Sequence, residues 1–306
     1  MNFMKIVSNS IKVVVGLGLL LFLINNIGLN NIIEKIANMQ LAYIFLLVLA
    51  FFANMLVGTL NLKILMVALN EKMHFFRLFN YNALSWSYGL FLPGKIGEFG
   101  ILVYFLKKEG VHLSNALIIS IIDKLTTFLA TFIIAILGFF TFFRFDAAII
   151  IVLIILALFL IGLFIIIGNR SRSFLKRFIL KKYANHFEGF SKNLFFLFKE
   201  KKVDLFANFM LTFLKLGLLF MNLHFLFLAI GKAVPLFAVF TIFAITAIVG
   251  TAPISIGGLG VKEYVGVLLF SQYGITQVIS GTVFIVFAFI KYAIGFGFIL
   301  LNLAKR

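Results

Sequence analysis

Long apolar runs separated by short polar stretches dominate the pattern of hydrophobic and polar positions along the chain. Six of these runs have the length of ~20 residues that a helix needs to cross the hydrocarbon core of a bilayer. They predict membrane-spanning helices at about 8–26, 41–62, 114–142, 147–168, 203–230 and 276–303. A short segment at 29–39 is predicted to lie at the interface. The pattern therefore predicts an all-α, multi-pass membrane protein.

Two further apolar regions, at about 78–109 and 234–273, are each interrupted by residues that do not suit a membrane helix. Proline removes a helical hydrogen bond and glycine favours open backbone, so each region is expected to break. The helical arms beside the first break are short for ~30 Å of hydrocarbon, so we predict re-entrant helical hairpins rather than full spans. The residues expected at the hairpin tips are Pro93, Gly94, Gly97, Pro253, Gly257, Gly258 and Gly260.

The basic residues indicate the orientation. If both termini are cytoplasmic and each hairpin leaves on the side that it entered, 19 Lys and Arg lie in cytoplasmic segments and 3 lie outside. This asymmetry agrees with the positive-inside rule. The segment 169–202 carries 10 of the basic residues and is predicted to form an amphipathic stretch on the cytoplasmic leaflet. We expect a protein of the cell membrane with both termini cytoplasmic.

The same layout makes two halves of a single domain, 1–306, correspond to each other. Residues 1–145 and 146–306 each contain a span, an interfacial segment, a second span, a hairpin and a third span. The first hairpin enters from the cytoplasm and the second from outside, so we predict an inverted repeat. Such repeats place a substrate site at their interface and permit alternating access. Chance similarity between apolar segments is the alternative.

Eight charged residues fall within membrane depth. Each would cost roughly 3 kcal/mol at the centre of a lipid-exposed helix, so we expect all eight to face the protein interior. They are the candidate substrate-binding residues Lys95, Glu98, Asp123, Lys124, Lys215, Lys262, Glu263 and Lys291. Five cations against three anions leave an excess of positive charge, which suits a ligand that brings negative charge, such as a lipid phosphate.

Polar residues at helical spacing support this interpretation. One set, Ser120, Asp123, Thr127 and Thr131, shares a face of the third predicted span, and a second set, Asn208, Thr212, Lys215 and Asn222, shares a face of the fifth. The alternative is that these stripes only hold helices together. Helices that begin after Gly97 and Gly260 would point the positive ends of their dipoles at a bound anion.

Other features exclude classes of function. With 63% hydrophobic and 12% charged residues, the composition does not fit a soluble domain. The net charge of +17 is explained by membrane orientation rather than by nucleic acid. The absence of Cys, four scattered His and the lack of a P-loop or Ser/His/Asp pattern give no reason to expect a metal, a cofactor or an enzyme.

Three motifs resemble the lysylphosphatidylglycerol synthase transmembrane-region family, which are flippase-like integral membrane proteins. They are Leu-Pro-Gly-Lys-x-Gly-Glu at 92–98, the pair Asp123-Lys124, and Pro-x-x-x-Gly-Gly-Leu-Gly-x-Lys-Glu at 253–263. Family members often carry an Arg where this chain has Gly100-Ile101. The sequence ends after the last predicted span, so we expect no soluble aminoacyl-transferase domain. The resemblance implies lipid translocation or head-group handling rather than aminoacyl-lipid synthesis.

We therefore expect a lipid flippase or transporter that moves an anionic, phosphate-bearing lipid through a polar cavity at mid-membrane depth. Rocking of one half against the other would carry the head group across the bilayer. Two alternatives stay open. One is an ion-coupled transporter of small solutes, and the other is a non-transporting membrane subunit that docks a glycosyl- or aminoacyl-transferase. The expected partners are membrane lipids and, in the last case, a lipid-modifying transferase.

Overall fold

The computed structural model describes residues 3–92, 96–167, 189–252 and 254–304, and over these ranges the chain is helical without any strand. The long helices are α1 (Phe3–Ile27), α3 (Leu41–Ala68), α6 (Leu113–Phe142), α7 (Phe145–Ile167), α10 (Lys202–Ala229) and α13 (Gln277–Ala304). The shorter helices are α2 (Leu29–Ala37), α4 (Phe75–Phe91), α5 (Ile96–Lys108), α9 (Phe190–Glu200), α11 (Leu236–Val249) and α12 (Val261–Ser271), with a 3-10 turn, η2 (Ile256–Gly258). The all-α prediction is confirmed.

The predicted spans coincide with the long helices. Among the described residues, α3, α6, α7, α10 and α13 are each long and apolar enough to cross a membrane. Helices α1 and α2 are separated by a bend of 79°. If these two helices together are counted as one broken span, the number of candidate spans among the described residues rises to six. The candidate tip residues Pro93, Gly94 and Lys95, together with Pro253 and the range 168–188, lie outside the described residues.

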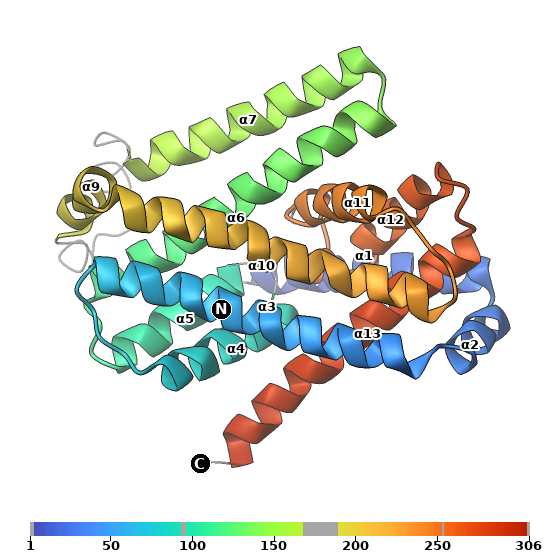
Figure 1. Cartoon of the computed structure of the whole chain (residues 1–306), viewed down its shortest axis with the longest axis horizontal. Helices are drawn as coiled ribbons and strands as arrows, with labels where there is room; N and C mark the ends of the chain where they lie inside the picture. The colour runs from blue at the N-terminus through green and yellow to red at the C-terminus, as the bar shows by residue number, and fades with distance from the viewer. Residues whose placement is uncertain (1–2, 93–95, 168–188, 253, 305–306) are drawn as a thin grey trace.

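The connections between helices gather at two opposite ends of the molecule (Figure 1). One end holds the α3–α4 and α5–α6 connections and α9, all predicted to be cytoplasmic. Here Arg77 Nη1 donates to Glu109 Oε2 at 2.6 Å, and Asn193 Nδ2 donates to Asn115 Oδ1 at 2.7 Å. The opposite end holds α2, the α6–α7 turn and the start of α11. The segments predicted for the two sides of the membrane are therefore separated in space.

The chain reverses direction at both predicted breaks. A Cβ built on Gly89 would lie 3.1 Å from the Cα of Glu98, although a continuous helix would place residues nine apart at about 13 Å. A Cβ built on Gly258 would lie 2.8 Å from the Cα of Gly250. Helix α4 consequently packs on α5, and α11 packs on α12. The interruptions predicted from the proline and glycine residues are present.

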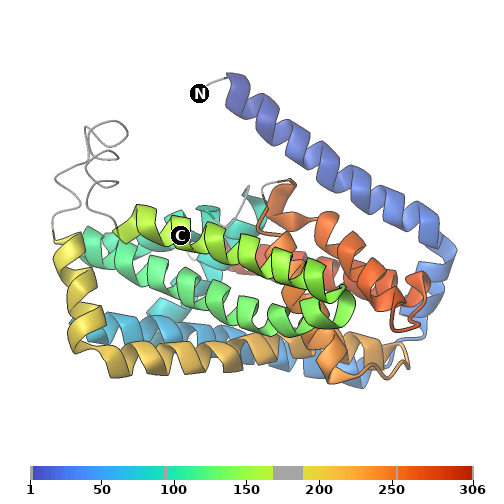
Figure 2. The same cartoon turned by 90° about the horizontal axis from the view of Figure 1, so that it is seen from above.

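Helices α1 and α7 occupy the periphery of the bundle. Figure 1 shows α7 at the outer edge of the bundle, and Figure 2 shows the N-terminal part of α1 standing away from it. Only 6% of the apolar window in α7 is buried by protein. The lipid must therefore solvate nearly all of this helix, which suits its uninterrupted run of apolar residues.

The polar faces of α3 and α10 meet in a buried seam. Asn208 Nδ2 donates to the carbonyl oxygen of Asn61 at 3.0 Å, and Asn61 Nδ2 donates to Thr212 Oγ1 at 3.0 Å. Asn54 Nδ2 donates to the carbonyl oxygen of Lys215 at 2.5 Å. Amide and hydroxyl groups within a bilayer need such partners because no water is present to replace them. These bonds join a helix of the predicted first half to a helix of the second.

Helix α9 differs from its prediction. The apolar stripe expected on the leaflet comprised Phe187, Phe190, Leu194 and Phe198, of which Phe187 lies outside the described residues. Phe190 and Leu194 are instead buried, at 6% and 4% exposed, because α9 packs across α6 and α10. Phe198 remains 48% exposed. Figure 2 shows α9 crossing the end of the bundle where α10 begins.

We predict that Gly260→Ala destabilises the protein more than Gly274→Ala does. Both glycines have positive φ, at 79° and 68°, so alanine costs about 1–2 kcal/mol at either position. A Cβ on Gly260 would also collide with the backbone oxygen of Gly16, whereas Gly274 has nothing within 4 Å. Thermal unfolding in detergent, followed through Trp86, measures the difference. Equal losses would show that the contact between Gly16 and Gly260 adds no stability.

We also predict that the acid sensitivity of folding depends on Glu109. Hydrogen bonds from Tyr81 and then from Arg77 lower the pKa of Glu109 below its ordinary value of 4.5. A lowered pKa in the folded state means that these bonds stabilise the fold above about pH 4.5, and that this contribution is lost as the pH falls through the folded-state pKa.

Glu109→Gln should therefore flatten the decline of unfolding free energy between about pH 5 and pH 3, as measured by denaturant unfolding. The matched control is Glu34→Gln, which removes an exposed carboxyl group of α2 and should follow the wild type. A Glu109→Gln variant with the wild-type decline would contradict the assignment.

Candidate functional site

Four charged side chains from three helices form a buried ion network. Asp123 on α6 lies at its centre, because its Oδ2 is 3.1 Å from Lys124 Nζ and its Oδ1 is 3.1 Å from Lys215 Nζ on α10. Lys124 Nζ also contacts Glu98 Oε1 on α5 at 2.5 Å. The side chain of Asp123 is 7% exposed and that of Lys215 is 13% exposed. The network thus joins the first hairpin to two long helices.

The network is electrically balanced, with two carboxylates and two ammonium groups. Neighbouring residues on a helix normally point in different directions, yet the flexible side chain of Lys124 reaches both Asp123 and Glu98. Lys215 completes the set and also donates to Thr127 Oγ1 at 2.8 Å. Burying these groups without one another would be strongly unfavourable, because charges in a low dielectric must be paired.

The two hairpins each carry a glutamate at the same helical position. Glu98 is the third residue of α5, and Glu263 is the third residue of α12. A carboxylate in the first turn interacts favourably with the positive end of the helix dipole. The helix starts that we expected to face a bound anion therefore already lie beside a carboxylate of their own.

The charged groups of the second hairpin are arranged differently from those of the first. Lys262 Nζ donates to the carbonyl oxygen of Gly257 at 2.7 Å, across the break. Glu263 is 5% exposed, and its Oε2 has no hydrogen-bond partner among the described residues. Lys291 on α13 interacts electrostatically with Glu263. The second hairpin thus holds a buried carboxylate that is incompletely satisfied.

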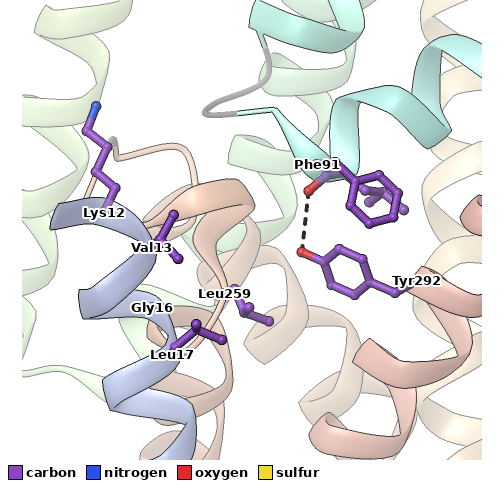
Figure 3. Close-up of a pocket in the computed structure, with 8 residues that line it drawn as sticks. Lys12, Val13, Gly16, Leu17, Phe91, Leu259 and Tyr292 are labelled. Carbon is purple, nitrogen blue, oxygen red and sulfur yellow. Dashed lines mark hydrogen bonds between the residues drawn. The ribbon is translucent and has the colours of Figure 1, made fainter. Parts of the chain in front are cut away.

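The two breaks contact each other. A Cβ built on Gly257 would lie 3.7 Å from the carbonyl oxygen of Leu90, at the end of α4. Tyr292 on α13 donates its hydroxyl to the same oxygen at 3.4 Å, and its ring packs edge-on against Phe91 at 5.6 Å (Figure 3). The two interruptions therefore lie side by side in the structure.

A cavity of about 220 Å³ lies beside this junction. Its walls are apolar apart from Lys12 and the hydroxyl group of Tyr292. None of the seven predicted substrate-binding residues that the structure describes lines it. Sequence reasoning did not single out Tyr292, although a tyrosine in an apolar span was a usable signal because its hydroxyl group needs a partner when buried.

The predicted site residues therefore separate into groups. The structure brings Glu98, Asp123, Lys124 and Lys215 into one network, and it places Glu263 within electrostatic range of Lys291. Lys262 bonds to the backbone of its own break. Among the described residues there is no cluster of three or more His, Asp or Glu that could hold a metal ion.

Comparison with known families agrees with the motifs. The model of the family described as "Lysylphosphatidylglycerol synthase TM region" matches residues 9–298, which is nearly the whole chain. No curated protein matches the sequence significantly. The matched range contains both breaks, the ion network, four of the six helices that correspond to the predicted spans, and most of the other two, α1 and α13. The chain therefore belongs to the lysylphosphatidylglycerol synthase transmembrane-region family.

Proposed function

We propose that this membrane protein moves an anionic, phosphate-bearing lipid across the cell membrane. The observation that carries the proposal is the buried network of Glu98, Asp123, Lys124 and Lys215 beside the first break. Ionised groups at membrane depth are expensive and mark pathways for substrates or ions. In this proposal the chain is a transporter rather than an enzyme, and both termini are cytoplasmic.

The hairpins supply the path for the head group. We place each hairpin as a re-entrant element, with α4–α5 entering from the cytoplasmic face and α11–α12 from the opposite face. The beginning of α4 and the end of α5 meet at one end of the molecule, where Arg77 and Tyr81 donate hydrogen bonds to Glu109. A change in the relative position of the two hairpins would open their junction first to one side and then to the other.

The balance of charge supports an anionic cargo. Among the described residues at membrane depth, the four lysines Lys124, Lys215, Lys262 and Lys291 face three carboxylates. Lys95 adds a further positive charge to the chain beside the first break. A phosphate group would offset this excess, and Glu98, Asp123 and Glu263 would hold the lysines in place between transport cycles.

A second function is supported by the tight pairing of the network. Asp123 is 5% exposed and contacts two lysines, which also fits a structural element of a subunit that does not transport. Such a subunit would dock a lipid-modifying transferase at the membrane. The two functions differ in whether the purified chain moves lipid by itself.

We predict that Glu98→Gln and Lys291→Met each reduce lipid transfer. Reconstitution into liposomes with a fluorescent phosphatidylglycerol, followed by chemical quenching of the outer leaflet, measures the rate. Glu98→Gln weakens the charge-assisted hydrogen bond from Lys124, worth about 1.5–3 kcal/mol, and should slow transfer about ten- to a hundredfold. Lys291→Met removes the cation that interacts electrostatically with Glu263, and it should also slow transfer. Glu34→Gln and Lys35→Met, on α2, are matched controls. Wild-type rates in both test variants would remove these residues from the mechanism.

A double substitution separates transport from stability. Asp123→Asn leaves Lys215 without its carboxylate and should destabilise the fold by about 3–5 kcal/mol. Adding Lys215→Met removes the unpaired charge and should restore most of that loss in thermal unfolding. If the network is transport machinery, the stable double variant stays inactive in the liposome assay. Recovery of transfer together with stability would show that the network is only structural.

A further inference from the structure

The cavity beside the junction of the breaks is bounded by four parts of the chain. Helix α1 forms one wall, the end of α4 and Leu259, two residues before α12, form the inner walls, and α13 closes the far side (Figure 3). The lining residues are Lys12, Val13, Gly16, Leu17, Leu90, Phe91, Leu259 and Tyr292. The cavity thus lies where both hairpins and the peripheral helix come together.

The cavity is accessible from the lipid. Figure 2 shows the N-terminal part of α1 standing away from the bundle. Three residues that line the cavity are exposed on the protein surface: Val13 is 38% exposed, and Leu17 and Phe91 are each 47% exposed. In a membrane-spanning protein these apolar surfaces meet acyl chains. Helix α1 approaches the second break closely at Gly16, whose Cβ would lie 3.1 Å from the carbonyl oxygen of Leu259.

The charge at this cavity has one sign. Among the described residues, Lys12 is the charged residue of its lining, and no carboxylate lines it. The described residues provide no ion pair for Lys12, which lies one helical turn before Gly16. Lysine side chains at membrane helices extend toward the head groups while their methylene stems cover apolar surface. A cation beside apolar walls complements a molecule with a negative head and a hydrocarbon tail.

The volume limits what can enter. A cavity of about 220 Å³ is smaller than the roughly 300–1,000 Å³ of sites that enclose a drug-sized ligand. It can therefore hold part of one chain rather than a whole lipid, while the remainder stays in the bilayer. The tyrosine hydroxyl group is already engaged with Leu90, so the inner wall offers contact mainly to hydrocarbon.

We propose that this cavity binds one hydrocarbon chain of an anionic membrane lipid whose head group lies against Lys12. The site rests on the proposed function, and it deepens that function by placing lipid entry laterally between α1 and the two breaks. It also adds residues outside the buried ion network, namely Lys12, Leu17, Phe91 and Tyr292. Binding of lipid at this site can be measured at equilibrium, without any movement of lipid across the membrane.

The test uses tryptophan as a reporter of lipid contact. Trp86 is the single tryptophan of the chain, so Trp86→Phe gives a silent background. Phe91→Trp and, separately, Leu17→Trp place reporters on opposite walls, and Leu158→Trp on α7 reports bulk lipid. Each variant is reconstituted with brominated phosphatidylglycerol or brominated phosphatidylcholine at equal mole fraction, and quenching is compared.

At both wall positions, the anionic lipid should be favoured roughly fivefold, the factor expected for one lysine beside an anionic lipid. At Leu158→Trp the two lipids should quench equally. Lys12→Gln should remove the preference, whereas Lys35→Gln should leave it. Equal quenching at the wall positions, or a preference that survives Lys12→Gln, would overturn the proposal.

The outcome is separable from that of the transport assay. Glu98→Gln in the reporter background should keep the lipid preference even though transfer is slowed. A preference without any transfer in the wild type would retain the site and reject the transport function. Transfer without a preference would reject this site and retain transport.

Discussion

The structure depends on pairing charges that the bilayer does not solvate. Asp123 lies between Lys124 and Lys215, and Lys124 reaches Glu98 in turn. Three helices must therefore keep their relative depth and rotation, since a shift of one would leave an ammonium or a carboxylate group without a partner. The reversal of the chain between α4 and α5 brings Glu98 back into this network. Backbone interruption and buried charge are thus parts of one arrangement.

Much of this architecture could be predicted from the sequence. The lengths of the apolar runs predicted the bounds of the long helices to within six residues, because span length is set by bilayer thickness. Proline and glycine marked both reversals, since their effects on the backbone are local. The spacing of Asn208, Thr212 and Lys215 predicted one polar face of α10, and that face forms the seam with α3.

The pairings between distant elements could not be predicted in the same way. Nothing in the local sequence tells that Lys215 meets Asp123, 92 residues away, rather than another carboxylate. The cavity residues were missed because apolar side chains and one lysine near a terminus carry no distinctive pattern. The burial of Phe190 and Leu194 was also missed, since an amphipathic helix can place its apolar face on protein as well as on lipid.

The seam between α3 and α10 has a mechanical consequence. Its amide and hydroxyl bonds fasten residues 41–68 to residues 202–229, so the N-terminal and C-terminal halves are interlocked rather than free to tilt past each other. Tilting the halves as rigid blocks would break these bonds where no water can replace them. Any conformational cycle must then use this pair of helices as a stationary frame. Displacement falls to the short helices and to α1, which take no part in this seam.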